Sequence, residues 1–224
     1  ADGSDQGGHH PDRVTAVVQE AARVSVRGSI GSGHNGAMSS SEPDLTVVVL
    51  AGGQSRRFGS DKLAAPLAGT TVLDHLLASL PPEWVVIAVG EERPTPRALT
   101  WTREDPPGGG PLAGIAAGLA FVATDLTAVV AGDMPYAVPG LRTLAAALAA
   151  AGPDTAAAVA VDDEGHANPL LAVYRTTAAR DLVPQPAHGI PAKTLLALPH
   201  LEVRITGVTS RDVDTPEDLQ SLQP

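Results

Sequence analysis

The feature that most constrains the fold is the stretch 47–62, in which a continuous apolar run ends at two adjacent glycines. The run Val47–Leu50 is typical of a strand that is buried on both faces. Gly52 and Gly53 lack a Cβ, so the backbone can bend there and a ligand can approach it closely. Backbone N–H groups at a strand exit, with cations nearby, favour the phosphates of a nucleotide. The stretch therefore predicts a phosphate-binding loop after a buried strand.

Two better-known phosphate loops do not fit this stretch. The pattern G-x-x-x-x-G-K-[ST] fails because Lys62 lies three residues after Gly59 and is followed by Leu63. The pattern G-x-G-x-x-G fails because the two glycines are adjacent. What remains, L-A-G-G-x-S-x-R-x-G-x-D-K, resembles the signature of nucleotidyltransferases. Within them it is similar to that of the molybdenum cofactor guanylyltransferases, the MobA-like family.

From Leu45 onward, strand and helix patterns alternate at short spacing. The expected strands are residues 46–50, 84–89, 99–102, 126–131, 155–161, 170–174 and 201–205. The expected helices are residues 72–80, 111–122 and 138–151, with helical stretches near Ala178 and Lys193 and a last helix opened by Thr215 and Pro216. The alternation predicts an α/β fold, a single domain with a mostly parallel, mixed sheet flanked by helices. The resemblance implies a Rossmann-like, glycosyltransferase-A-like nucleotidyltransferase fold.

Residues 1–44 differ in composition from the rest. They are rich in Gly, Ser, Asp and His, and such a segment buries too little apolar surface to offset the entropy of ordering it. We expect a disordered extension over residues 1–44 and the nucleotidyltransferase domain over residues 45–224. Met38 is a candidate for the natural start.

Charge and composition exclude several classes of function. A net charge of −10 argues against nucleic acid or an anionic membrane as the main partner, so anionic ligands need a local cationic site. The chain has no cysteine, which excludes disulfides and thiolate metal sites and fits a cytoplasmic location. The longest strongly apolar run, residues 112–123, is shorter than the roughly 20 residues that span a bilayer.

Polar loops follow the carboxyl ends of the expected strands, where ligands bind in parallel α/β sheets. Asp133 follows the run 126–131 and precedes Met134 and Pro135. A carboxylate at a strand tip facing a phosphate loop is placed to bind Mg²⁺. The alternative, an N-cap for the helix 138–151, is disfavoured because Asp133 lies too far upstream. The segment G-D-M-P resembles the family's C-D-M-P.

The segment D-V-D-T-P-E-D-L, residues 212–219, resembles the family's N-x-N-T-P-E-D-L, with Asp212 and Asp214 in place of asparagines. By analogy Asp214 is the second residue on the metal side. The alternative is that Asp214 or Thr215 caps the helix that follows. The role of Asp212 is left open at this point.

A second glycine-rich loop begins at Asp105 and matches the family's D-x-x-P-G-x-G-P-L-A-G. A carboxylate can accept hydrogen bonds from both N1–H and N2–H₂ of guanine. The resemblance makes Asp105 a nucleotide-contacting residue, and the alternative is a turn-starting Asp before prolines. The resemblance implies that the following residues of this chain contact the nucleotide: Leu50, Ala51, Gly52, Gly53, Lys62, Asp105, Pro111, Leu112 and Asp133.

Lys62 and Arg57 are the candidate cations for the triphosphate, and with Asp133 they form the predicted catalytic set. Lys62 would stabilise the developing charge on the α-phosphoryl group and the leaving pyrophosphate. The alternative for Lys62 is an exposed ion pair with Asp61.

The resemblance extends from Thr46 to Leu219 and implies where the second substrate binds. Segments in the C-terminal half suggest Asn168, Arg175 and Lys193 as acceptor-binding residues, while His188 is equally compatible with a solvated turn.

The activity implied is transfer of GMP from GTP, with Mg²⁺ as cofactor, to molybdenum-molybdopterin. Transient contacts with molybdoenzymes or cofactor-synthesis proteins are implied as well. Many relatives carry Asn where this chain has Ala88-Val89-Gly90, so two related activities stay open. These are a cytidylyltransferase of the same cofactor and a sugar-phosphate nucleotidyltransferase. A further alternative is a non-catalytic nucleotide-binding module.

Overall fold

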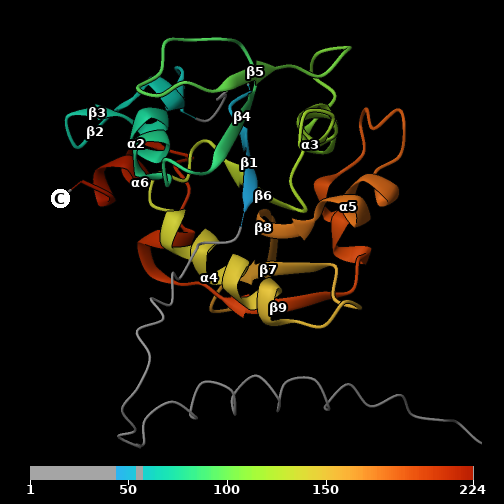
Figure 1. Ribbon diagram of the computed structural model, residues 1–224. Coiled ribbons are helices and arrows are strands. Elements are labelled where there is room, and N and C mark those ends of the chain that lie inside the picture. Colours follow the sequence, from blue (N-terminus) through green and yellow to red (C-terminus); the bar gives the residue numbers. More distant parts are fainter. Residues whose placement is uncertain (1–43, 54–57, 224) are drawn as a thin grey trace, which may run out of the picture. The chain divides into compact units, whose positions relative to one another are not determined.

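The apolar runs of the sequence form a central sheet in the computed structural model (Figure 1). The structure describes residues 44–53 and 58–223. The predicted extension up to residue 43, Met38 and the predicted catalytic Arg57 lie outside these residues. The described residues belong to one compact unit, Glu42–Pro224.

The sheet has seven strands, and one of them runs antiparallel to the other six. Its order is β5 (Thr100–Thr102), β4 (Val85–Val89), β1 (Leu45–Leu50), β6 (Leu126–Ala131), β8 (Ala167–Arg175), β7 (Ala157–Val161) and β9 (His200–Arg204). Neighbouring strands are parallel except that β8 runs antiparallel to both β6 and β7. The prediction of a mostly parallel, mixed sheet is confirmed.

Helices cover both faces of this sheet. They are α2 (Val72–Ser79), α3 (Pro111–Leu119), α4 (Val138–Ala150), α5 (Thr176–Leu182) and α6 (Pro216–Ser221), with the 3₁₀ turns η1 (Lys62–Ala64), η2 (Ala192–Ala197) and η3 (Gly207–Ser210). On one face, α2 and α4 pack on side chains such as Val47 and Val49. On the other face, α3 and α5 pack on Val48 and its neighbours (Figure 1). A central strand buried on both sides explains why residues 47–50 are continuously apolar.

The observed elements differ from the predicted ones in a few places. A short hairpin of β2 (Pro66–Leu67) and β3 (Thr70–Thr71) was not predicted, because strands of two residues leave no readable periodicity. The helix α3 ends at Leu119, before the predicted residue 122. Arg180 of α5 then donates hydrogen bonds to the carbonyl groups of Leu119 and Val122. The backbone continues in turns up to Val122, whose N–H donates to Leu119 O at 3.3 Å, and Arg180 satisfies carbonyl groups at this helix end.

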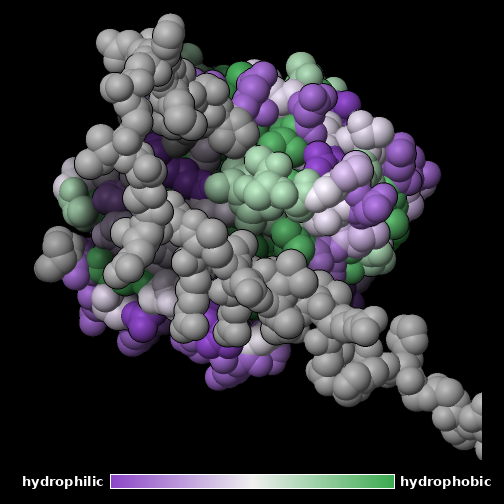
Figure 2. All heavy atoms as spheres, turned by 60° about the horizontal axis from the view of Figure 1, so that its bottom comes forward, coloured by the Kyte–Doolittle hydropathy of each residue, from purple (hydrophilic) through white to green (hydrophobic). Residues whose placement is uncertain are grey.

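Large apolar side chains lie inside the described part of the protein. Among the described residues, the large hydrophobic side chains that are exposed are Val85, Phe121 and Val208. The face in Figure 2 shows hydrophilic residues around a pale green, weakly hydrophobic area, with smaller dark green, strongly hydrophobic spots between them. In the range that the structure describes, no helix combines the length and the apolar character needed to cross a membrane.

Hydrogen bonds just beyond the strands tie together the carboxyl ends of β5, β4, β1 and β6. Gly90 N–H donates to Thr102 O at 2.9 Å, Ala51 N–H donates to Val89 O at 2.8 Å, and Gly132 N–H donates to Leu50 O at 2.9 Å. The backbone of the predicted phosphate loop therefore starts from a fixed edge of the sheet.

Replacing Gly90 by Ala should distort this edge. Gly90 has φ +154°, and a Cβ added there would lie 2.7 Å from Ala51 O. We expect a loss of at least about 2 kcal/mol of unfolding free energy, measured by chemical denaturation, because backbone strain and a clash with backbone combine. Gly152→Ala is the control, since nothing lies within 4 Å of its added Cβ. Equal stability of the two variants would contradict the close approach of Gly90 to Ala51.

Candidate active site

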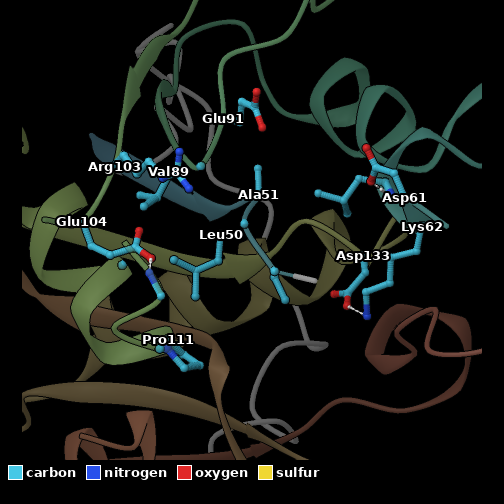
Figure 3. A pocket seen from close by; sticks show the side chains of 18 of the residues that line it. Leu50, Ala51, Asp61, Lys62, Val89, Glu91, Arg103, Glu104, Pro111 and Asp133 are labelled. Atoms are coloured by element: carbon cyan, nitrogen blue, oxygen red, sulfur yellow. Dashed lines mark hydrogen bonds and ion pairs between the residues drawn. The ribbon is translucent and has the colours of Figure 1, made fainter. Parts of the chain in front are cut away.

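A cleft of about 1050 Å³ opens at the carboxyl ends of β1, β4 and β6. In Figure 3, Leu50 and Ala51 lie between two groups of side chains. Lys62, Asp61 and Asp133 lie on one side, and Arg103, Glu104 and Pro111 lie on the other. The predicted residues Gly52 and Gly53 also line the cleft. The sheet therefore brings the two predicted loops to one cleft, as the rule for parallel strands requires.

Lys62 is held on the turn η1 by its neighbour. Asp61 is the N-cap of this turn and accepts a hydrogen bond from Leu63 N–H at 3.0 Å. The Lys62 ammonium group pairs with Asp133 and, at 2.9 Å, with Asp214 Oδ1. Burial lowers the pKa of Lys62, but its hydrogen bonds to both carboxylates outweigh this effect and the pKa is raised. Lys62 is therefore a cation throughout the neutral range.

Asp133 lies directly beyond β6, as predicted, and does not cap α4, because the N-cap of α4 is Ala137. The Asp133 side chain is 14% exposed. Within the described part of the chain, its buried Oδ1 atom has no hydrogen-bond partner. A buried carboxylate oxygen without a donor is costly unless a cation approaches it. The atom thus fits a metal ligand.

The segment that carries Asp214 is fixed against Asp133. Val213 N–H donates to Asp133 O at 3.0 Å. Thr215, rather than Asp214, caps α6, in a capping box with Asp218. The capping alternative for this segment is therefore realised by Thr215, and the Asp214 carboxylate faces Lys62.

The structure also brings Asp212 into this cluster. Carboxylate oxygens of Asp133, Asp212 and Asp214 lie within 4.8 Å of one another. Hard divalent cations such as Mg²⁺ prefer oxygen ligands of this kind. The donor set and the orphaned Asp133 Oδ1 therefore fit a divalent metal ion.

In the absence of metal, the ionised Asp212 lowers the stability of the folded protein. Desolvation by its neighbours, followed by repulsion from Asp133 and Asp214, raises the pKa of Asp212 above its ordinary value. A raised carboxyl pKa in the folded state means that stability is full below the unfolded pKa and is lost as pH rises through the folded pKa.

Replacing Asp212 by Asn should therefore stabilise the metal-free chain at pH 7, by less than about 1 kcal/mol because the side chain is exposed. The gain should shrink as pH falls through the raised folded-state pKa toward the unfolded value of about 4, and should vanish below it. Thermal unfolding of both forms in chelator, across pH 3 to 7, measures it. A gain that is the same at every pH would contradict the repulsion.

The opposite side of the cleft is closed by the second glycine-rich loop. Glu104 Oε1 accepts a hydrogen bond from Gly108 N–H at 3.0 Å, and both residues line the cleft together with Pro111. Asp105 is exposed and is not among the lining residues. Leu112 is fully buried in the core and likewise does not line the cleft. The nucleotide contacts of Asp105 and Leu112 stay predictions.

The predicted acceptor residues are not brought together. Arg175 pairs with Leu126, at the amino end of β6, and donates to Thr155 O at 2.8 Å and to Gly152 O at 3.3 Å. The structure therefore places Arg175 at the edge of the sheet opposite the cleft.

The other acceptor-side residues also lie outside the cleft lining. Asn168 accepts a hydrogen bond from the N–H of Leu170, and Leu170 lines the cleft. Lys193 is exposed on η2. His188 is exposed next to Gly189, whose N–H donates to Gly109 O at 2.8 Å, so this segment contacts the second glycine-rich loop.

Several cleft residues were missed by the sequence reasoning. Arg93, Arg103 and Glu104 line the cleft, from the segments that follow β4 and β5. The signal available was their position just beyond two expected strands, but no motif marks them. They add two cations to the described lining.

The fold and the site define a nucleotidyltransferase-type α/β protein: a mostly parallel sheet, a glycine-rich loop after its first strand, and a lysine–carboxylate cluster at the carboxyl edge. Residues 47–198 match the family described as MobA-like NTP transferase domain. The chain belongs to this family.

Relatives and solved structures agree with the family. A protein of Mycobacterium tuberculosis named "probable molybdenum cofactor guanylyltransferase" is 39% identical over 144 residues, which cover 60% of this chain and 70% of that protein. A protein of Natronomonas pharaonis with the same name is 31% identical over 200 residues, covering 79% of this chain and 96% of the relative. The crystal structure of molybdopterin-guanine dinucleotide biosynthesis protein A from Archaeoglobus fulgidus has a TM-score of 0.61 at 25% identity, covering 80% of this chain and 96% of that chain.

Proposed function

We propose that this protein transfers GMP from GTP to molybdenum-molybdopterin, forming molybdopterin guanine dinucleotide and pyrophosphate. The observation that carries the proposal is the Lys62 pair with Asp133 and Asp214, beside Gly52 and Gly53 in one cleft. The names of the relatives support this activity over a sugar-phosphate or cytidylyl transfer. The complete lysine–carboxylate cluster also favours an enzyme over a non-catalytic binding module.

The two sides of the cleft suit the two ends of GTP. The side with Lys62 offers positive charge to phosphates, and the backbone of Gly52 and Gly53 adds N–H groups to the lining of the cleft. The side with Glu104 offers a carboxylate, which can accept hydrogen bonds from N1–H and N2–H₂ of guanine. We therefore place the triphosphate near Lys62 and the base near Glu104, with Asp105 as the sequence-predicted second carboxylate.

The reaction is a displacement at the α-phosphorus. An oxygen of the acceptor's terminal phosphate forms the new bond, and the bond to the bridging oxygen of pyrophosphate breaks. Lys62 stabilises the charge that develops on the phosphoryl oxygens. The acceptor phosphate is already anionic near neutral pH, so no protein general base is needed.

A divalent ion, in our proposal Mg²⁺, would be held by Asp133 and Asp214 with Asp212 beside them, and it would neutralise phosphate charge. The substrates would be GTP and molybdenum-molybdopterin. Transient contacts with molybdoenzymes or cofactor-synthesis proteins, and a cytoplasmic location, stay predictions from the sequence.

Nucleotide binding tests the base preference. We expect GTP with Mg²⁺ to raise the melting temperature of the protein more than CTP, ATP or UTP at equal concentration, because stabilisation grows with ligand concentration over Kd. If Glu104 or Asp105 binds the guanine base, its replacement by Ala should abolish the preference for GTP. Glu104→Ala and Asp105→Ala are therefore compared with the wild type. A larger shift with CTP would instead indicate a cytidylyltransferase.

A further inference from the structure

We propose that Arg93 is a further residue that binds the polyphosphate of the nucleotide, and that Asp61 is the positioning residue that holds it there. The inference rests on the proposed nucleotidyl transfer, since it names a contact for the leaving pyrophosphate. Arg93 lies in the segment after β4 and lines the cleft.

The first observation is that one carboxylate joins Arg93 to the turn that carries Lys62. Asp61 Oδ2 accepts a hydrogen bond from Arg93 Nη1 at 2.7 Å. Its other oxygen, Oδ1, accepts from Leu63 N–H at 3.0 Å and so caps η1. Asp61 therefore sets the position of both Arg93 and Lys62, although the two cations come from segments that are distant in sequence.

The second observation is that the Arg93 guanidinium has donors to spare. A guanidinium carries several N–H donors in a planar fork that matches phosphate oxygens. Among the described residues, the partner of Arg93 is Asp61, which engages Nη1. The Arg93 side chain is 28% exposed, so it is partly buried and still accessible to a ligand.

The third observation fixes the side from which an anion can approach. A second, smaller hollow of about 420 Å³ adjoins the Asp61–Arg93 pair, and Asp74, Glu91 and Glu92 line it. These carboxylates repel an anion, and the described lining of this hollow offers no cation besides Arg93. Glu91 lines the main cleft as well, but that cleft adds Lys62 and Arg103. The main cleft carries Lys62 close to Asp61, on the side opposite Arg103 and Glu104 (Figure 3). A phosphate group therefore reaches Arg93 from the Lys62 side of the main cleft.

The charge of a nucleoside triphosphate requires a cation in addition to Lys62. The Lys62 ammonium is already paired with Asp133 and Asp214, whereas a nucleoside triphosphate brings several negative charges. Arginine and phosphate form strong, often bidentate, charge-assisted hydrogen bonds. Arg93 would thus hold the β- and γ-phosphates, which leave together as pyrophosphate.

The test compares ligands that share or lack those phosphates. Binding of inorganic pyrophosphate, GTP and GMP, each with Mg²⁺, is measured by calorimetry on wild type, Arg93→Gln and Arg93→Lys. Arg204→Gln is the matched control, because Arg204 forms an exposed ion pair with Asp163, outside the cleft lining. We expect Arg93→Gln to weaken pyrophosphate and GTP about ten-fold and to leave GMP unchanged.

Arg93→Lys keeps the charge without the fork, so its loss should be smaller, and it serves as the test if Arg93→Gln does not fold. Arg204→Gln should bind all ligands as wild type does. Unchanged pyrophosphate binding in Arg93→Gln, or an equal loss for GMP, would overturn the proposal. A protein that prefers CTP but shows the same loss of pyrophosphate would contradict the guanylyl transfer and keep the role of Arg93.

Discussion

Replacing Asp133 by Asn should lower the rate of GMP transfer by at least about a hundred-fold. Asn keeps the shape of the side chain but offers one neutral oxygen in place of a charged carboxylate. The oxygen that would be lost or neutralised is either the partner of Lys62 or the buried Oδ1 without a donor. The fold should survive, because the bond from Val213 N–H goes to the backbone carbonyl of Asp133.

The measurement is pyrophosphate release at saturating substrates, together with a titration of Mg²⁺ by calorimetry. Asp163→Asn is the control: its side chain is 74% exposed and belongs to a surface ion pair. We expect wild-type rates from the control and weak metal binding from Asp133→Asn. Full activity in Asp133→Asn would show that the carboxylate cluster does not serve the reaction.

Replacing Lys62 by Gln should also cost about a hundred-fold or more in rate, for a different reason. The positive charge next to the α-phosphate is lost, while the metal ligands remain. Three carboxylates then lie within 4.8 Å without the ammonium of Lys62. We therefore expect the metal-free variant to melt at a lower temperature than wild type and to regain stability when Mg²⁺ is added.

Rates and melting temperatures, each with and without Mg²⁺, measure both effects. Lys62→Arg separates charge from geometry, since a planar guanidinium cannot replace the compact ammonium between Asp133 and Asp214. We expect it to keep more stability than activity. A Lys62→Gln protein with wild-type rates would remove Lys62 from the mechanism.

Much of the fold could be predicted because its central strands carry an unambiguous pattern. Val47–Leu50 and Leu126–Ala131 lie next to each other in parallel at the centre of the sheet. The first is a continuous apolar run, and the second is apolar except for the buried Thr127. The strand β8 (Ala167–Arg175) was predicted too short, since Asn168 and Pro169 interrupt its pattern. Sheet contacts with β7, including a register shift, extend it beyond what local propensity indicates.

The site was predictable where residues follow strands within a motif. The loop glycines, Lys62, Asp133 and Asp214 all reach one cleft, because parallel strands end at the same edge. Arg93 and Glu104 could not be found this way. They follow β4 and β5, and no recognised motif includes them. Arg175 shows the opposite case: its segment resembles the family's, yet the antiparallel direction of β8 takes it to the edge opposite the cleft. Its contact with the acceptor stays a prediction.

The most direct test of the proposed guanylyl transfer follows the product itself. The purified protein is incubated with Mg²⁺, molybdenum-molybdopterin and each of the four nucleoside triphosphates in turn. Dinucleotide and pyrophosphate are quantified together. We predict equal amounts of molybdopterin guanine dinucleotide and pyrophosphate with GTP, and neither product with the other nucleotides. A cytosine dinucleotide from CTP, or no dinucleotide from GTP, would contradict the proposal.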